Sequence, residues 1–499
     1  MEFKLHLVIW LSTVLYSIYN MFLFTRGVDV VVFNSTGHMK NGWPLIGELR
    51  DGSDIEWESL KSFSFSVFPW VVINFWGAEL FRLNCWQPEV WYIFVSFSFI
   101  LYKFGCVSLF CLALQPSSYV LIIRFGGKSR SIWFFSCLIL FTVNIWKKYY
   151  FYMANNYEHN YIMMVVGLWS HLKCLSFSLD TINTKRKKQS SSAMNCHKTL
   201  NILAYIFYLP LLLFGPFLLY SDFNKSFNFP CKTSLKRRLL AFICNFTRYM
   251  GYALFIEFCL HFVYFNALQY ETIARMPDLS LYGGGYWMGL YFYLKFVVAY
   301  GMSGNFAMLD HIEPETPPRC VLRIHLYSQM WKYFDSGLHK FLKRYIYAPV
   351  MEKIKIRGRN GFTFKRVFVN MICFIFVFFW HGVEKHILIW VALNYLGIVV
   401  ESLSISISQC DFFNRLRMSV LKTKPMNDRF NAFVSTPLYT MSVLSNYYFF
   451  TEYEIGNIYL QRVLNQSFNR FAIMFVCNYS ACRVSQHLFN VGAKKILGT

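Results

Sequence analysis

Apolar segments long enough to cross a lipid bilayer recur from one end of this chain to the other. A membrane-spanning helix needs about 20 mostly apolar residues. The 499-residue sequence is 56% hydrophobic and only 15% charged, whereas about a quarter of the residues in soluble proteins are charged. The pattern predicts an all-α polytopic membrane protein. The alternative, a large soluble α-helical protein with a buried core, does not account for runs of this length and number.

The candidate spans are unequal in length. Several are short or nearly touch, so some must merge or re-enter the membrane without crossing it, and we expect roughly ten to twelve crossings. Residues 5–24 are followed by no small-residue cleavage site, so we expect a first transmembrane helix there and not a cleaved signal peptide. The candidate spans are residues 5–24, 63–81, 89–102, 104–124, 131–146, 160–178, 199–220, 239–266, 285–303, 366–382, 385–402, 431–450 and 468–482.

The formal net charge of +23 comes from basic clusters between the spans, for example at residues 185–188 and 353–366. Such clusters predict cytoplasmic loops, not a nucleic-acid partner, and they would also suit an anionic substrate that carries phosphate. The fourteen cysteines are scattered, with no Cys-x-x-Cys pair. This spacing indicates neither a disulfide framework nor a zinc module.

Ionisable side chains interrupt the apolar stretch "FIFVFFWHGVEKHILIW" at residues 374–390. Burial in hydrocarbon is costly, so His381 is expected either to face a cavity or to hydrogen-bond between helices. Glu384 would orient the imidazole if the helix continued for one more turn. We expect structural roles for Glu401 and Asn394. Asp335 would pair with Lys or Arg, cap a helix at Ser336, or act in a site. The sequence spacing does not distinguish between these roles.

Two stretches carry a resemblance to a known family. The segments "PPRCVLRIHLYSQMWKYFDSGLHKFLKRYIYAPV" (317–350) and "FIFVFFWHGVEKHILIWVALNYLGIVVE" (374–401) resemble the membrane-bound O-acyltransferases, and within them the Hedgehog acyltransferase branch. Weaker likeness extends to residues 208–223 and 441–450. The resemblance covers residues 160–480. It implies one integral membrane acyltransferase domain, residues 1–499, with helices and re-entrant segments around a central tunnel.

The resemblance also implies an activity and its site. The enzyme would lie in the endoplasmic reticulum membrane, or the Golgi, and move palmitate from palmitoyl-CoA to the N-terminal cysteine amine of secreted Hedgehog- or EGF-type ligands. His381 and Asp335 match the catalytic pair, Asn446 matches an asparagine of the acyl-CoA pocket, and Trp331 matches an aromatic gate. Cys320 matches a cysteine that ligates the iron of haem b. The residues themselves leave Cys320 equally open to an unliganded loop thiol.

The expected chemistry follows from these residue types. An α-amine has a pKa of about 8, so a neutral imidazole at His381 would take its proton. Asn446, Trp331 or protonated His381 would stabilise the oxyanion. Asp335 would hold the imidazole, hold the ammonium, or donate a proton in its neutral form. The cysteine thiol could also attack first, followed by an S-to-N shift.

Other functions compete with this one. Within the family, the acceptor would be a hydroxyl of a Wnt-type protein or of a lipid. Outside it, His381 and Glu384 would form the proton relay of a transporter, although paired broken half-helices are not evident, or the chain would be a membrane scaffold. A cytosolic CoA ester and a secreted peptide can meet only within the membrane, which would explain a histidine at that depth.

Overall fold

The computed structural model describes residues 2–28, 37–46, 49–149, 157–188, 196–212, 214–228, 233–320, 325–354 and 359–497. The side chains of residues 185–188 and 355–363 lie outside this description, and with them much of two predicted basic clusters.

The described residues are almost entirely helical. Two short strands, β1 (Met39–Asn41) and β2 (Leu49–Asp51), pair antiparallel. The helices are α1 (Glu2–Gly27), α3 (Ile55–Leu83), α4 (Pro88–Arg124), α5 (Ser129–Tyr149), α6 (Tyr157–Lys188), α7 (Cys196–Ile206), η2 (Leu209–Leu211), α8 (Tyr220–Asn228), α9 (Leu235–Leu260), η3 (Phe265–Ala267), α10 (Tyr270–Arg275), α11 (Asp278–Leu309), α12 (Tyr327–Tyr333), α13 (Ser336–Phe341), the π-helical turn η5 (Leu342–Tyr347), α14 (Ala348–Lys353), α15 (Arg359–His381), α16 (Lys385–Ser408), α17 (Asp411–Val420), α18 (Lys424–Phe450), α19 (Tyr453–Leu464) and α20 (Phe468–Leu497).

Seven helices in the described part of the chain are long and apolar enough to span a membrane: α1, α4, α5, α6, α9, α15 and α16. The all-α polytopic class is therefore confirmed. Four further predicted spans fall on α3, α11, α18 and α20, which are long helices that are not among these seven. Two adjoining predicted spans merge into α4, which kinks at Gly105 (φ 82°). The predicted span 199–220 is instead broken into α7, η2 and the start of α8.

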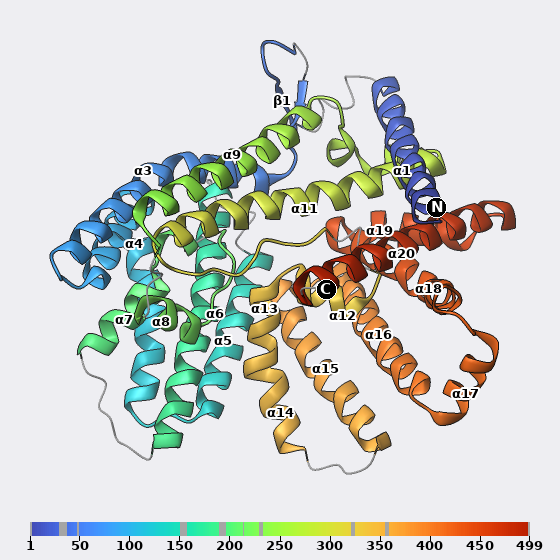
Figure 1. The fold of residues 1–499 in the computed structure, drawn as a ribbon. Coiled ribbons are helices and arrows are strands. Elements are labelled where there is room, and N and C mark those ends of the chain that lie inside the picture. The colour runs from blue at the N-terminus through green and yellow to red at the C-terminus, as the bar shows by residue number, and fades with distance from the viewer. Residues whose placement is uncertain are drawn as a thin grey trace.

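The helix α11 runs through the middle of the arrangement and ties its parts together (Figure 1). It packs against α1 and α9 along much of its length, and it also contacts α3 and α18. Below it in the view, α4, α5 and α6 stand together on one side (Figure 1). On the other side α15, α16, α18 and α20 pack in succession. The first group meets α11 through Trp169 of α6, whose ring centroid lies 6.5 Å from that of Tyr300, and the second group meets it through α18.

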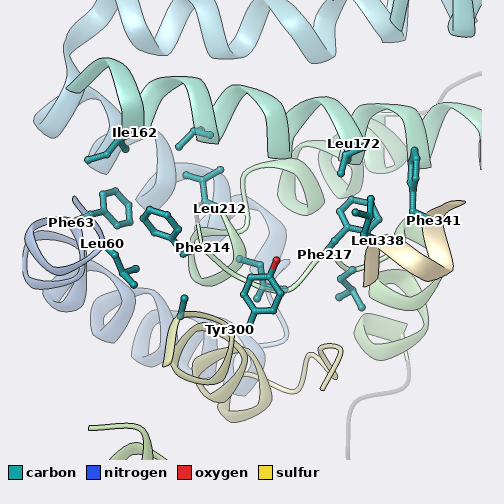
Figure 2. Packing of buried hydrophobic residues seen from close by; sticks show 14 of the residues in the cluster. Leu60, Phe63, Ile162, Leu172, Leu212, Phe214, Phe217, Tyr300, Leu338 and Phe341 are labelled. Carbon is teal, nitrogen blue, oxygen red and sulfur yellow. The ribbon is translucent and has the colours of Figure 1, made fainter. Parts of the chain in front are cut away.

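A cluster of aromatic and aliphatic side chains fills the space between α3, α6, α11 and α13. Figure 2 shows Phe217 close to Leu338 and Phe341 of α13, with Tyr300 of α11 nearby. Gly337 fits here because it has no side chain: a Cβ atom would lie 2.2 Å from the carbonyl oxygen of Phe217. The first turn of α13 is thus packed directly on the backbone of Phe217, which fixes the position of Asp335 just before it.

Candidate active site

A cavity of about 890 Å³ lies between the start of α3 and parts of α6, α11, α12, α13, α15, α16, α18 and α19. Four of the five site residues expected from the sequence line it: His381, Asp335, Trp331 and Asn446. These residues are far apart in the chain and come from α15, the turn before α13, α12 and α18. Most of the remaining wall is apolar, and much of it is aromatic.

The histidine reaches the cavity because its helix stops there. The last residue of α15 is His381, and Gly382 follows with φ +134°, a conformation that side-chain-bearing residues rarely adopt. Asn144 of α5 satisfies the interrupted backbone. Its amide nitrogen donates to the Phe379 carbonyl (3.0 Å), and its oxygen accepts from the Val383 N–H (2.9 Å). The break thus places an imidazole at the cavity wall without leaving these two backbone groups unpaired.

Aromatic rings surround the imidazole. The edge-to-face partners of His381 are Trp390, at 5.1 Å between ring centroids, and Phe449, at 5.3 Å. Trp390 and Phe449 also pack on each other at 4.4 Å. This packing holds the ring in one orientation and keeps bulk water away from it.

The expected contact between Glu384 and His381 is wrong. Because Gly382 ends the helix, Glu384 does not lie one helical turn beyond His381. Its carboxylate instead pairs with Lys147 of α5 at 2.6 Å and lies 3.5 Å from the Nε2 atom of His386. Glu384 therefore ties the α15–α16 turn to α5, and it does not complete the proton relay that a transporter would need.

Asp335 both caps a helix and faces the cavity. Its Oδ1 atom accepts a hydrogen bond from the Leu338 N–H (2.8 Å), and its Oδ2 atom accepts one from the Tyr300 hydroxyl (3.0 Å). Burial raises the pKa of the Asp335 carboxyl above its usual range, although both hydrogen bonds act to lower it. The carboxyl group is therefore held in place by partners from α11 and α13.

Trp331 is held by an asparagine that sequence reasoning assigned a structural role. The indole N–H of Trp331 donates to the Asn394 side-chain oxygen (3.2 Å), and the Asn394 amide nitrogen contacts the Ser445 hydroxyl (3.3 Å). Glu401 accepts a hydrogen bond from the Ser328 N–H (3.1 Å) at the start of α12. Since the indole N–H already has a partner, Trp331 serves the cavity as a wall and not as an oxyanion donor.

A charged group in the cavity wall was missed by sequence reasoning. The Lys295 ammonium, on a side chain buried in α11, lies 2.7 Å from Asp54 and 2.6 Å from Glu56 at the start of α3. All three residues line the cavity. A signal was present, because Lys295 interrupts the apolar run 285–303, and a charge inside such a run indicates a partner or a site.

The expected haem site is not supported. Cys320 is half-buried and lines neither this cavity nor the second cavity, which lies between α1, α11, α18, α19 and α20. No step of the chemistry below uses haem.

Comparisons with known proteins agree with this geometry. The model of the MBOAT family, the membrane-bound O-acyltransferases, matches residues 129–445. This chain belongs to that family. It is 26% identical over 472 residues to protein-cysteine N-palmitoyltransferase Rasp of Drosophila melanogaster, covering 92% of this chain and 90% of the relative. It is 25% identical over 442 residues to protein-cysteine N-palmitoyltransferase HHAT of Mus musculus, covering 85% of each chain. The membrane-bound O-acyltransferase gup1 of Schizosaccharomyces pombe is 28% identical over 225 residues, covering 43% of this chain and 34% of the relative.

The family settles the class of reaction. The chain is a multi-pass membrane acyltransferase, which excludes the transporter and the non-catalytic scaffold that its composition left open. His381, Asp335, Trp331 and Asn446 all lie within or at the edge of the matched segment, and they share one cavity.

Proposed function

We propose that this acyltransferase moves palmitate from palmitoyl-CoA to the α-amine of an N-terminal cysteine on secreted proteins of the Hedgehog and EGF type. The observation that carries the proposal is the meeting of His381, Asp335, Trp331 and Asn446 in one mostly apolar cavity. Two relatives named protein-cysteine N-palmitoyltransferases that match most of the chain support the choice of donor and acceptor. We place the enzyme in the endoplasmic reticulum or Golgi membrane, and its single domain over residues 1–499.

The apolar wall suits the donor chain. Aromatic and aliphatic side chains such as Phe292, Phe296 and Leu168 line the cavity. Each buried methylene of the acyl chain would contribute about 0.8 kcal/mol. The depth of the apolar part would then select chain length.

Acidic residues at the cavity suit the acceptor. Five carboxyl groups line it together with one ammonium, that of Lys295; they belong to Asp54, Glu56, Asp335, Glu452 and Glu454. Five carboxylates against one lysine favour a positively charged acceptor terminus and disfavour the phosphates of CoA. The acceptor therefore approaches past α3 and α19, and CoA from another side.

The transfer itself conserves every atom and charge. The ionised Asp335 carboxylate attracts the acceptor ammonium, which releases its first proton to water and becomes a neutral amine. The amine nitrogen attacks the thioester carbon, the His381 imidazole takes the second proton from that nitrogen, and the Asn446 amide stabilises the oxyanion that forms. The carbon–sulfur bond then breaks as the amide forms. The CoA thiolate receives the proton from His381, which returns to its starting state.

A peptide assay with purified protein tests the proposal. With palmitoyl-CoA, a peptide with a free N-terminal cysteine should be acylated, whereas its N-acetylated form and a peptide with only an internal serine should not. His381→Ala should reduce the rate by at least about 100-fold. His386→Ala is the matched control, because His386 lies five residues away and does not line the cavity. Transfer to the internal serine would instead indicate a hydroxyl acceptor.

One further peptide separates the two routes to the amide. Replacing the N-terminal cysteine by serine keeps the amine and removes the thiol. Direct attack by the amine predicts that this peptide is still acylated, while an obligatory S-to-N shift predicts no product.

A further inference from the structure

A second cavity, of about 600 Å³, lies between α1, α11, α18, α19 and α20. It is separate from the candidate active site, and α18 forms part of the wall between them. Asn446 and Phe449 line the first cavity, whereas Tyr447 and Leu444 line the second. Its volume falls within the range of about 300–1,000 Å³ that is typical of small-molecule sites.

One side of this second cavity is cationic. Arg462 of α19 and Arg470 of α20 both pair with the carboxylate of Asp278, at 2.8 Å and 2.6 Å. Two guanidinium groups thus share one carboxylate, which leaves an excess positive charge. The Arg470 side chain is 67% exposed, so most of its hydrogen-bond donors are open to a further anion. Guanidinium groups bind phosphate oxygens in paired hydrogen bonds.

The other side of the cavity is apolar and lies beside exposed apolar side chains. Val443 and Leu444 of α18 and Ile473 and Met474 of α20 line it. Ile473 is 65% exposed and Val476, one turn further along α20, is 50% exposed. In a membrane protein, an exposed apolar face of this kind contacts lipid tails. The cavity therefore continues into a lipid-facing surface.

We propose that this second cavity binds an anionic glycerophospholipid. Its phosphate lies at Arg462 and Arg470, and one acyl chain runs along α18 and α20 into the bilayer. A free phosphate would leave the apolar wall empty, and a zwitterionic lipid would bring a cation to the arginines. The occupant steadies α18, α19 and α20 against α11, because it contacts all four helices.

Thermal unfolding of the purified, delipidated full-length protein in a neutral detergent tests the proposal. Dioleoylphosphatidylglycerol should raise the Tm by several degrees, because a ligand that binds only the folded state stabilises it. Dioleoylphosphatidylcholine and inorganic phosphate should leave the Tm unchanged. An equal rise with phosphatidylcholine would show general solvation by lipid, and an equal rise with phosphate would show an anion site only. Either result would overturn the proposal.

Variants connect the response to this cavity. The double variant R462Q/R470Q should lose the phosphatidylglycerol response, while R130Q, which changes an exposed arginine at the start of α5, should keep it. Met474→Trp fills the apolar part without touching the ion pairs, and it should also lose the response. A full response in Met474→Trp or in the double variant would refute the site. The readout does not involve acyl transfer, so the outcome is independent of the proposed reaction.

Discussion

The Tyr300 hydroxyl donates a 3.0 Å hydrogen bond to Oδ2 of Asp335 and so joins α11 to the turn before α13. The same carboxyl group accepts the Leu338 N–H at 2.8 Å through its other oxygen. Burial raises the pKa of Asp335, and the hydrogen bond from Tyr300 opposes that rise. Tyr300 therefore helps to keep the carboxyl group ionised.

Tyr300→Phe should lower activity and shift its pH dependence. Loss of a hydrogen bond to a charged group costs about 1.5–3 kcal/mol, or roughly 10- to 100-fold in rate. Without the hydroxyl, the pKa of Asp335 rises further, so the acidic limb of the kcat/KM profile should move to higher pH. Tyr205→Phe, which removes a hydroxyl that donates to the Leu218 carbonyl away from the cavity, is the control. A limb that moves to lower pH would mean that the protonated carboxyl group is the active form.

The sequence predicted the helical membrane architecture because hydropathy depends on local composition alone. It also grouped His381, Asp335, Trp331 and Asn446, through a family resemblance and not through spacing. The structure shows why spacing failed for Glu384: one residue, Gly382, turns the chain and sends that carboxylate to Lys147. Such a turn depends on partners from another helix, which a local pattern does not reveal.

The ion cluster of Lys295, Asp54 and Glu56 was missed for a related reason. The acids lie in a polar segment that looks solvated, and more than 200 residues separate them from the lysine. Only the lysine could have been singled out from the sequence, because it is a charged residue within an apolar run. The break of the predicted span 199–220 is similar, because Phe217 packs under α13 instead of continuing a helix.

Gly382→Ala should destabilise the protein and abolish most activity. Its φ of +134° is strained for alanine, which costs about 1–3 kcal/mol. The added Cβ would also lie 3.2 Å from the Lys147 ammonium. Relief of this strain would move His381, so the loss of kcat should exceed the loss of folded protein. Gly251→Ala, in the middle of α9 with no atom within 4 Å of the new Cβ, should leave both properties unchanged or slightly improve stability.

Lys295→Met should reduce the gain in stability between low and neutral pH. Burial raises the pKa of Asp54, but the Lys295 ammonium outweighs it and holds that pKa below its usual value. In the native protein this contribution is present above about pH 4 and is lost as pH falls through the lowered pKa. Without the ammonium, burial is opposed mainly by the hydrogen bond from the Trp57 N–H, so the pKa of Asp54 rises and the gain in stability from low to neutral pH becomes smaller.

The size of the Lys295→Met effect is also testable. Breaking a buried pair costs about 3–5 kcal/mol, less here because Asp54 and Glu56 are partly exposed. Lys40→Met removes a lysine that pairs with Glu58 at the surface, and it should cost less than about 1 kcal/mol. Tm measured across the pH range for both variants distinguishes the two cases. A parallel pH profile for Lys295→Met and the parent protein would contradict the assignment.

Asn394→Leu should loosen the wall of the candidate active site while keeping the branched shape of the side chain. It removes the acceptor for the Trp331 indole N–H and the contact with Ser445, at a cost of about 1–3 kcal/mol. Because Trp331 lines the cavity, the KM for palmitoyl-CoA should rise more than kcat falls.

A double-mutant cycle of Asn394→Leu with Trp331→Phe checks the mechanism. If Asn394 acts through the indole, the two changes in KM are not additive. Additive changes would mean that Asn394 supports the fold through Ser445 alone, and that the indole is positioned by its packing on Phe374 and Trp390.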